Sequence, residues 1–199
     1  RKADKKRELL PFYLPWVAGV LANGKCAQDD IVMTVMLWRL DADDIAGALE
    51  IARYAMTWGL TMPTGRRPTP YLLAEEVALA AQRLLAAKQP VELANLLDTI
   101  ALTERADMPD IVRAKLHKIT GYVLRDASQL PEALAHLQRA IQLERTIGVK
   151  KDIEQLERQL RPKPEPAPKT KTTKPRTRKP AAKPAARRGR PPKAAKAAG

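Results

Sequence analysis

Five aspartates in the first quarter of the chain could bind a divalent cation. Asp29 and Asp30 precede a second group formed by Asp41, Asp43 and Asp44. Carboxylates that converge in space can hold Mg²⁺ and support metal-dependent cleavage of phosphodiester bonds. Each aspartate also has a structural role open to it, as a helix N-cap, a first-turn acid or a turn residue. The residues alone leave both interpretations open.

Other groups that commonly carry catalysis are scarce. The chain has one cysteine, Cys26, and two histidines, His117 and His136. A single cysteine excludes a disulfide framework within the chain and fits a reducing compartment. This set cannot form a usual structural zinc site, and no Gly-rich phosphate loop is present. We therefore expect no ATP hydrolysis, no metal and no cofactor, with Mg²⁺ needed only if the aspartates are catalytic.

Nearly all of the net charge lies in the C-terminal segment. Residues 161–199 contain fourteen Lys or Arg, nine Pro and one acid, which is +13 of the whole chain's +14. The segment has no aromatic, leucine or branched aliphatic residue, so it cannot bury enough apolar surface to offset the entropy of ordering. We predict a disordered tail with extended polyproline II segments, which attracts nucleic acid by its charge.

One short sequence within this tail could recognise DNA more specifically. Arg188-Gly189-Arg190-Pro191 resembles an AT-hook, because a narrow A/T-rich minor groove attracts arginine side chains and Gly189 permits close backbone approach. The same residues also arise easily in a tail of this composition. The residues predicted to bind DNA are Arg187, Arg188, Gly189, Arg190, Pro191, Lys193, Lys174, Arg176, Arg178 and Lys179.

The body that precedes the tail, residues 1–160, has a net charge of only +1 and is predicted to form one helical domain. Its apolar residues recur at helical spacing, and no run alternates with a period of two. A short first helix is expected to end near Asn23-Gly24. The later helices are predicted at Asp30–Leu40, Asp44–Trp58, Tyr71–Lys88, Val91–Ala106, Asp110–Arg125, Glu132–Ile147 and Val149–Leu160.

The apolar stretch Leu9–Ala22 follows a basic start and superficially resembles a secretory signal. Pro11 and Pro15 interrupt it, no cleavage site follows, and it is too short to span a bilayer. We interpret it as core. The aromatic residues expected to anchor this first helix are Phe12, Tyr13 and Trp16. Because the chain begins with Arg1 and not Met, we expect the native protein to carry a further N-terminal segment.

The last long helices have a weak tetratricopeptide-like register. Gly121, Ala133, Leu137 and Ala140 stand where that repeat places a glycine and its packing residues. Only a faint echo occurs earlier in the chain, so a regular solenoid is not expected. We predict an all-α fold in which antiparallel helix hairpins form a bundle, followed by the disordered basic tail.

Two further features suggest contacts with partners. Val149, Ile153, Leu156 and Leu160 follow a 4-3-4 spacing, which is typical of a heptad seam and fits either a subunit or partner contact or core packing. The proline-bounded loop after residue 60 carries the adjacent cations Arg66 and Arg67. They are secondary candidates for DNA contact, and a solvated loop is the alternative. We also expect Asp43 to cap the helix that follows it.

Several uncommon sequence segments occur in a fixed order along the chain. They include Lys5-Lys6-Arg7-Glu8-Leu9-Leu10-Pro11-Phe12, Gln28-Asp29-Asp30-Ile31, Met33-Thr34-Val35-Met36-Leu37-Trp38-Arg39-Leu40-Asp41, Ala106-Asp107-Met108-Pro109-Asp110 and Pro162-Lys163-Pro164-Glu165-Pro166. The succession resembles the small terminase subunit of temperate contractile-tailed, peduovirus-type phages. The resemblance extends over essentially the whole chain.

The resemblance implies a role in viral DNA packaging. Such a subunit would bind concatemeric double-stranded viral DNA at the packaging site, form a homo-oligomer and present the DNA to the large ATPase subunit. It would act in the host cell cytoplasm, without a membrane. Members of the family are commonly labelled the endonuclease subunit and carry an additional N-terminal segment. Two alternatives remain: a subunit that itself cuts DNA, and a helical interaction scaffold with a non-specific DNA tether.

Overall fold

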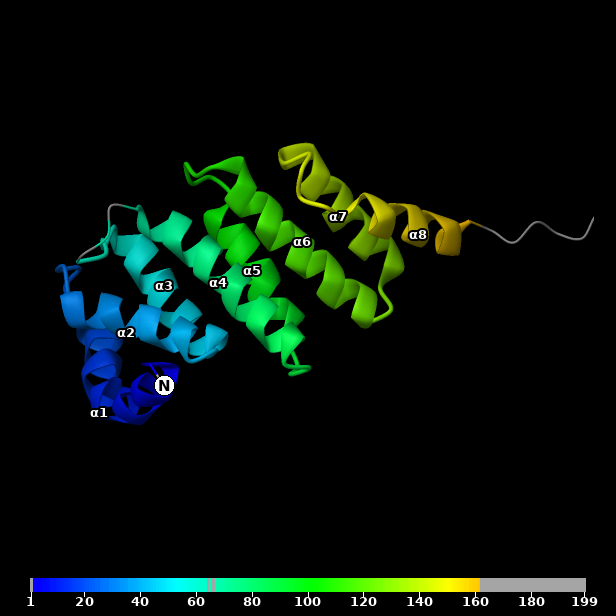
Figure 1. Cartoon of the computed structure of the whole chain (residues 1–199). Coiled ribbons are helices and arrows are strands. Elements are labelled where there is room, and N and C mark those ends of the chain that lie inside the picture. The colour runs from blue at the N-terminus through cyan, green and yellow to red at the C-terminus, as the bar shows by residue number, and fades with distance from the viewer. Residues whose placement is uncertain (1, 64, 66, 162–199) are drawn as a thin grey trace, which may run out of the picture. The chain divides into compact units, whose positions relative to one another are not determined.

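A computed structural model describes residues 2–63, 65 and 67–161, and within them the fold is entirely helical (Figure 1). This confirms the predicted all-α class. Residues Arg1–Pro162 form one compact unit. The eight helices of the described residues are α1 (Lys2–Asn23), α2 (Asp30–Asp41), α3 (Ile45–Trp58), α4 (Thr69–Ala86), α5 (Leu93–Thr103), α6 (Asp110–Asp126), α7 (Leu130–Leu143) and α8 (Lys150–Leu160).

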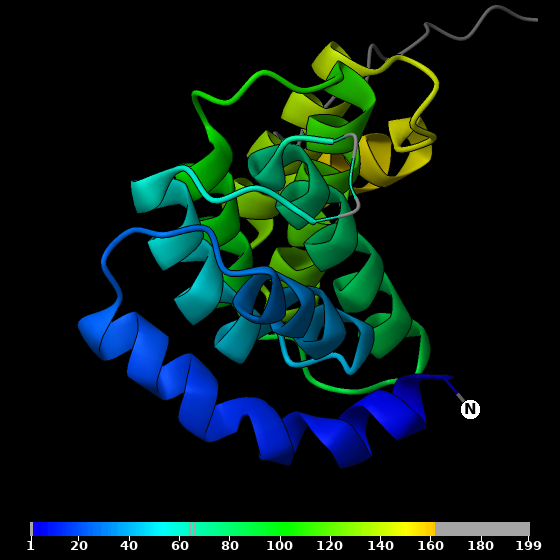
Figure 2. The ribbon, with the colours of Figure 1, turned by 90° about the vertical axis from the view of Figure 1, so that its left-hand side faces the viewer.

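The first helix is longer than predicted, and it curves along its length (Figure 2). Pro11 and Pro15 lie inside α1 on its exposed side. Each proline lacks the N–H that would bond to the carbonyl four residues earlier, and such positions bend a helix. The helix nevertheless continues through both prolines. The basic residues that precede the apolar stretch are therefore its first turns.

The interpretation of Leu9–Ala22 as core is correct for only one side of α1. Val17 is buried, and Tyr13 packs partly against the core. By contrast, Phe12 is 79% exposed, so the prediction that it anchors the helix is wrong. Trp16 is 53% exposed and holds α1 only through the hydrogen bond from its indole to Asp29. The reason is geometric: α1 packs on α2 and on a small part of α3, and these cover only one of its sides.

The second helix is covered by three others. It contacts α1, α3 and α4, which explains why its sequence is apolar on nearly every face. Its fully enclosed side chains include Val32, Met33, Met36 and Leu40. These side chains belong to the main core, which continues through α3 and α4 to part of α6.

The α6–α7 hairpin confirms the predicted packing register. Gly121 is buried, and a Cβ at this position would lie 2.7 Å from Leu137 Cδ2 and 3.3 Å from the Ala133 carbonyl oxygen. The absence of a side chain therefore lets the two helices approach closely. Ala133, Leu137 and Ala140 are fully buried in the contact. A second, smaller core lies beside this hairpin, where Leu156 of α8 covers it.

Candidate functional site

The residues predicted to bind DNA in the basic tail, from Lys174 to Lys193, lie outside the described residues, as does Arg66. Arg67 lies in the described part of the chain. Its guanidinium forms an ion pair with Glu75 of α4 and stands 5.4 Å from the centre of the Tyr71 ring. The structure therefore gives Arg67 a local role in holding its loop against α4.

The first two candidate catalytic aspartates lie at the start of α2. Asp29 is the N-cap, and its Oδ1 accepts a hydrogen bond from the Val32 backbone N–H at 2.9 Å. Its second oxygen accepts the indole N–H of Trp16 at 3.0 Å. Asp30 accepts a hydrogen bond from Gln28 Nε2 at 2.9 Å. Both residues were expected to open this helix, and they do.

The second group of aspartates lies in the turn between α2 and α3, surrounded by cations from other helices. Asp41 forms an ion pair with Lys6 of α1. The Asp43 carboxylate forms ion pairs with two arginines, Arg7 of α1 at 3.1 Å and Arg83 of α4 at 3.0 Å. The carboxylates therefore connect this turn to helices that are distant in the sequence.

The helix cap in this turn differs from the prediction. Asp44, and not Asp43, caps α3, because its Oδ1 accepts the Gly47 backbone N–H at 2.9 Å. Asp43 instead adopts a left-handed backbone conformation with φ of 65°. The other Asp44 oxygen pairs with Arg39 at 3.0 Å. A side chain at position 47 would require the Arg39 guanidinium and the Asp44 carboxylate to shift from this pairing.

These contacts favour the structural interpretation of the five aspartates. Asp41, Asp43 and Asp44 are each paired with at least one cation, so Mg²⁺ would have to displace Lys or Arg side chains to reach them. Across residues 2–63, 65 and 67–161, no three His, Cys, Asp or Glu side chains are grouped so that they could hold a metal ion.

The predicted heptad seam divides into buried and exposed positions. Val149 and Leu156 are almost completely enclosed beside Leu137 of α7, so core packing describes these two positions. Ile153 is partly buried in the same cluster. Leu160, at the end of α8, is 37% exposed. A second chain could therefore reach Leu160 and part of Ile153, but not Val149 or Leu156, without unpacking the helix.

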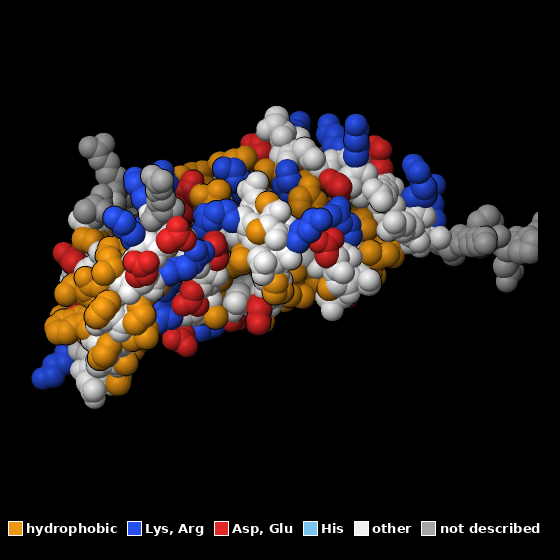
Figure 3. Space-filling model, turned by 60° about the horizontal axis from the view of Figure 1, so that its bottom comes forward, with side chains coloured by type: hydrophobic (Ala, Val, Ile, Leu, Met, Phe, Trp, Pro, Cys, Tyr) orange, Lys and Arg blue, Asp and Glu red, His pale blue; other side chains and the backbone are white. Residues whose placement is uncertain are grey.

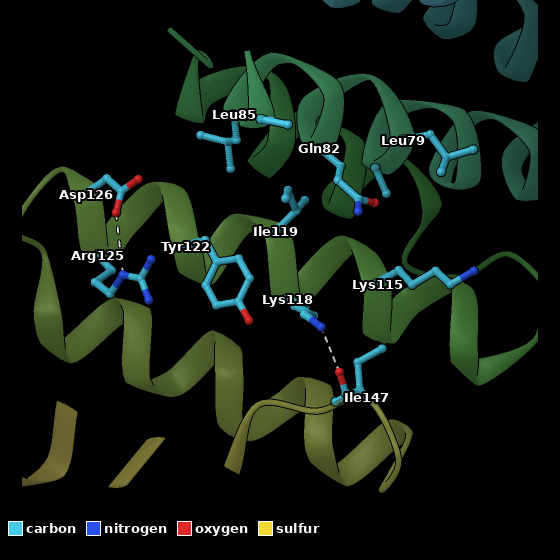
Figure 4. A pocket seen from close by; sticks show the side chains of 12 residues that line it. Leu79, Gln82, Leu85, Lys115, Lys118, Ile119, Tyr122, Arg125, Asp126 and Ile147 are labelled. Atoms are coloured by element: carbon cyan, nitrogen blue, oxygen red, sulfur yellow. Dashed lines mark hydrogen bonds and ion pairs between the residues drawn. The ribbon is translucent and has the colours of Figure 1, made fainter. Parts of the chain in front are cut away.

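A groove that our sequence analysis did not identify lies between α4 and α6. It has a volume of about 590 Å³ and is also bordered by Ile147, after α7. Leu79 and Leu85 of α4 form an apolar wall opposite Ile119 and Tyr122 of α6 (Figure 4). The groove is therefore both apolar and open to solvent, which is a common form for a binding site.

The α6 side of this groove is basic. Lys115, Lys118, Tyr122 and Arg125 follow an i, i+3, i+7, i+10 spacing, so they lie on one face of the helix. This spacing is visible in the sequence and could have shown that these side chains share one side of a helix. Lys118 Nζ donates to the Ile147 carbonyl at 2.7 Å, whereas Lys115 is exposed at the groove's edge.

Tyr122 and Arg125 are held in place by α8. The Tyr122 hydroxyl donates to Asp152 at 3.2 Å, and Arg125 pairs with the same carboxylate at 3.3 Å. The Arg125 guanidinium also lies 4.9 Å from the centre of the Tyr122 ring. Burial and then the nearby Asp152 carboxylate raise the pKa of Tyr122 to about 12, so it remains a neutral donor at physiological pH.

The two histidines, isolated in the sequence, meet across the α6–α7 contact. The Nδ1 atoms of His117 and His136 are 3.1 Å apart, so one ring donates and the other accepts. Burial, followed by His136, Arg139 and Arg113, lowers the pKa of His117 to about 4. Burial also lowers the pKa of His136. The pair is therefore neutral at physiological pH.

The fold and these contacts define an all-helical protein in which the aspartates between α2 and α3 form ion pairs with cations of the same chain. Nearly all of the net charge lies in the basic C-terminal segment of the sequence. The chain belongs to the phage small terminase subunit family. A family model described as the phage small terminase subunit matches residues 1–111, which include α1 to α5 and the aspartate turn. This membership confirms the resemblance seen in the sequence and supports a role in phage DNA packaging.

The chain is similar in sequence to two individual phage proteins. The chain is 64% identical over 195 residues to the protein named "Terminase, endonuclease subunit" of Escherichia phage P2, covering 98% of this chain and 78% of the relative. It is 29% identical over 170 residues to the "Probable terminase, endonuclease subunit" of Haemophilus phage HP1 (strain HP1c1), covering 77% of this chain and 60% of the relative. No solved structure matches the chain. In the described part, none of the helices combines the length and hydrophobicity needed to cross a membrane.

Proposed function

We propose that this protein is a DNA-packaging adaptor that binds concatemeric double-stranded viral DNA at the packaging site and presents it to the large ATPase subunit. The family membership supports this role. The charge distribution suggests which part of the chain contacts DNA and which part contacts proteins. The tail holds +13 of the chain's +14, so the DNA contact belongs to the tail and the protein contacts belong to the helical body. The adaptor acts as a homo-oligomer in the host cell cytoplasm.

Binding to DNA is expected to depend strongly on salt. If six to ten of the tail's cations contact phosphates, affinity falls by roughly 10³ to 10⁵ between 50 and 200 mM salt, because bound counterions are released. A mobility-shift titration of the whole chain and of a chain ending at Arg161 measures this directly. Deletion should remove most of the affinity and of the salt slope. Equal affinity of the two chains would refute the proposal.

The AT-hook part of the proposal needs a separate comparison. Changing Arg188 and Arg190 to Ala should weaken binding to A/T-rich duplex more than to G/C-rich duplex, because only the former has the narrow minor groove. The matched control changes Arg176 and Arg178 to Ala, which removes the same charge outside the motif. Equal losses for both variants on both duplexes would leave charge alone as the cause.

The α4–α6 groove is our candidate for the contact with the large subunit. Its apolar wall and its exposed Lys115 suit a segment of that subunit that combines apolar and acidic side chains. Lys115→Glu should weaken association with the large subunit in a pull-down, and Leu79→Ser, at a groove residue that is 37% exposed, should weaken it further. Lys151→Glu, an exposed reversal on α8, is the control and should leave association unchanged. Identical association of all three variants would exclude the groove.

The relatives' printed names provide a reason to test a second function, intrinsic DNA cleavage. The purified chain is incubated with phage DNA and Mg²⁺, beside Asp43→Asn and Asp44→Asn. Because those carboxylates are paired with Arg7, Arg83 and Arg39, we expect no metal-dependent cutting by the chain itself. Cutting that both variants abolish would establish the endonuclease alternative.

A preference for packaging-site DNA would distinguish the adaptor from the scaffold alternative. A helical scaffold with a non-specific tether would bind packaging-site and unrelated DNA of equal length with the same affinity. The adaptor should prefer packaging-site DNA under competition at physiological salt.

A further inference from the structure

The α4–α6 groove contains a partly buried cation that pairs with no carboxylate of the described residues. Lys118 Nζ donates to the Ile147 carbonyl and lies 5.9 Å from the centre of the Tyr122 ring, and neither partner is an acid. Arg125, by contrast, already pairs with Asp152. A charge that is partly removed from water is stabilised most by an opposite charge that bonds to it. The groove therefore has a place for a carboxylate beside Lys118.

The wall opposite this lysine is apolar and open to solvent. Leu79 is 37% exposed, Leu85 is partly buried, and both face the groove from α4 (Figure 4). Hydrophobic side chains also gather on α1 (Figure 3). The groove offers more than apolar area, because Lys115 and Lys118 border it. Its lining therefore specifies the charge of an occupant as well as its hydrophobicity.

The groove follows α6 for about three turns. Lys115 and Arg125 lie at its two ends and are ten residues apart, which is about 15 Å along the helix axis (Figure 4). A helical segment of about ten residues would span the same distance. The occupant that contacts the whole groove is thus about three helical turns long.

The walls of the groove have no backbone groups available to an extended segment. The backbone groups of α4 and α6 bond within each helix, and the Ile147 carbonyl already accepts from Lys118. An extended segment would bury its own N–H and C=O groups without partners, whereas a helix satisfies them internally. A polyproline segment needs a groove lined by several aromatic rings. Tyr122 is the one aromatic residue among the described residues that line this groove.

We propose that the α4–α6 groove binds an acidic amphipathic helix of the large subunit. The apolar side of this helix contacts Leu79 and Leu85 of α4. Its carboxylates pair with Lys115 and Lys118 of α6. The inference rests on the proposed function for the identity of the partner, and on the groove's lining for the chemistry of the bound segment.

Composition argues against the chain's own C-terminal segment as the occupant. Residues 162–199 contain no Leu, Ile, Val, Met, Phe, Tyr or Trp that could fill an apolar groove. They are also strongly basic, so the lysines of α6 would repel them.

Peptides of about 20 residues that cover the sequence of the large subunit identify the bound segment. Fluorescence anisotropy with the whole chain measures a dissociation constant for each. The binding peptide should carry apolar residues at i, i+3 or i+4, and i+7, with Asp or Glu beside them. Proline at its centre should weaken binding about 100-fold, because it breaks the helix. Unchanged binding of the proline peptide would overturn the helical assignment.

Filling the groove tests where the helix binds. Ala86→Trp places a large side chain within the lining of the groove, whereas Ala87→Trp places the same side chain at the next residue, which is exposed outside it. Ala86→Trp should weaken binding of the peptide and of the large subunit at least about 10-fold, and Ala87→Trp should leave both unchanged. Circular dichroism and urea denaturation check that both variants fold. Equal affinity of the two variants would overturn the groove as the site.

Charge neutralisation tests the role of the lysines. Lys118→Gln removes the charge but keeps an N–H donor, and it should weaken binding at least about 10-fold. Lys115→Gln, at an exposed position, should weaken it about 2–5-fold, and Lys151→Gln on α8 is the control that should change nothing.

A double-mutant cycle distinguishes a direct contact from a disturbed groove. Changing the peptide's paired Glu to Gln should weaken binding to the native chain but not to the matching lysine variant. Zero coupling for both Lys115 and Lys118 would overturn their pairing with carboxylates.

Further outcomes separate this inference from the adaptor role. A large subunit that binds no form of the chain refutes the adaptor's protein contact together with the groove. A large subunit that binds the native chain and Ala86→Trp equally well overturns the groove alone, and the adaptor role stands. Self-association that Ala86→Trp abolishes, while binding to the large subunit persists, would assign the groove to a second copy of this chain and overturn the choice of partner.

Discussion

The two terminal helices of the described body, α1 and α8, have different relations to the core. In α8 the apolar residues lie on one side, and Leu156 is enclosed by its own chain. In α1 apolar residues lie on two sides, so Val17 is buried while Phe12 remains exposed. A helix with one apolar side can bury that side against a single neighbouring helix. A helix with two apolar sides at the edge of a bundle leaves one of them exposed.

The largest expected difference between the two helices is in folding stability. Leu156→Ala should lower the free energy of unfolding by about 2–5 kcal/mol, because it leaves a cavity in a closed core. Phe12→Ala should change it by less than about 0.5 kcal/mol when the protein is monomeric. Urea denaturation at low protein concentration measures both values. Similar losses for the two variants would contradict the comparison.

Adding a side chain should lower the folding stability at Gly121, in the α6–α7 hairpin, and raise it at Gly19, in α1. Gly121→Val should destabilise the fold by about 1–3 kcal/mol, because the new side chain meets Leu137 and the Ala133 carbonyl. Gly19→Ala, in α1, meets nothing within 4 Å and should stabilise the helix by about 0.5–1 kcal/mol. Thermal unfolding of the two variants decides the point, and a loss of stability in both would show that α1 is packed more tightly on this side.

The N-terminal end of α1 should loosen when its connection to the α2–α3 turn is cut. Asp43→Asn weakens the ion pairs with Arg7 and Arg83, and we expect a loss of about 1 kcal/mol, since these pairs are partly exposed. Amide hydrogen exchange should accelerate in the first turns of α1 and remain unchanged in α8. Asp98→Asn, which breaks an exposed pair with Arg53, is the control and should not alter exchange in α1.

The α6–α7 contact should give the stability a dependence on pH. The folded-state pKa of His117 is about 4, below its ordinary value of 6.5, so the unfolded chain binds more protons between these values. Stability should therefore fall as the pH drops from about 6.5 to 4 and level off below. A pKa difference of this size corresponds to about 3 kcal/mol for a fully buried group, and we expect a smaller loss because the ring is partly exposed. His117→Gln should flatten the urea-denaturation profile across this range, and an unchanged profile would exclude His117 as its origin.

The fold was largely predictable because each helix carries its own local signals. Asp29 as the N-cap of α2, Pro109 before α6 and Gly148 before α8 mark boundaries through backbone chemistry that does not depend on distant residues. The cap of α3 was misplaced by one residue, because Asp43 and Asp44 are equivalent in the sequence. The arginines from α1, α2 and α4 that pair with them distinguish the two residues.

The candidate sites were less predictable because they depend on long-range contacts. The groove residues Lys115, Lys118 and Arg125 share one side of α6, but the apolar wall opposite them comes from α4. The pairing of His117 with His136 likewise requires the α6–α7 hairpin. A spacing within one helix shows which residues share a side, and the packing decides what that side faces.

The sequence by itself determined the helical class, the register of the α6–α7 hairpin and the concentration of charge in the tail. These follow from local backbone preferences, from residue size and from composition. The tertiary structure decided that the aspartates of the turn bind arginine and lysine side chains, and that Phe12 faces solvent while Leu156 does not. Burial and ion pairing depend on which other helices arrive at a surface, and no single segment encodes that.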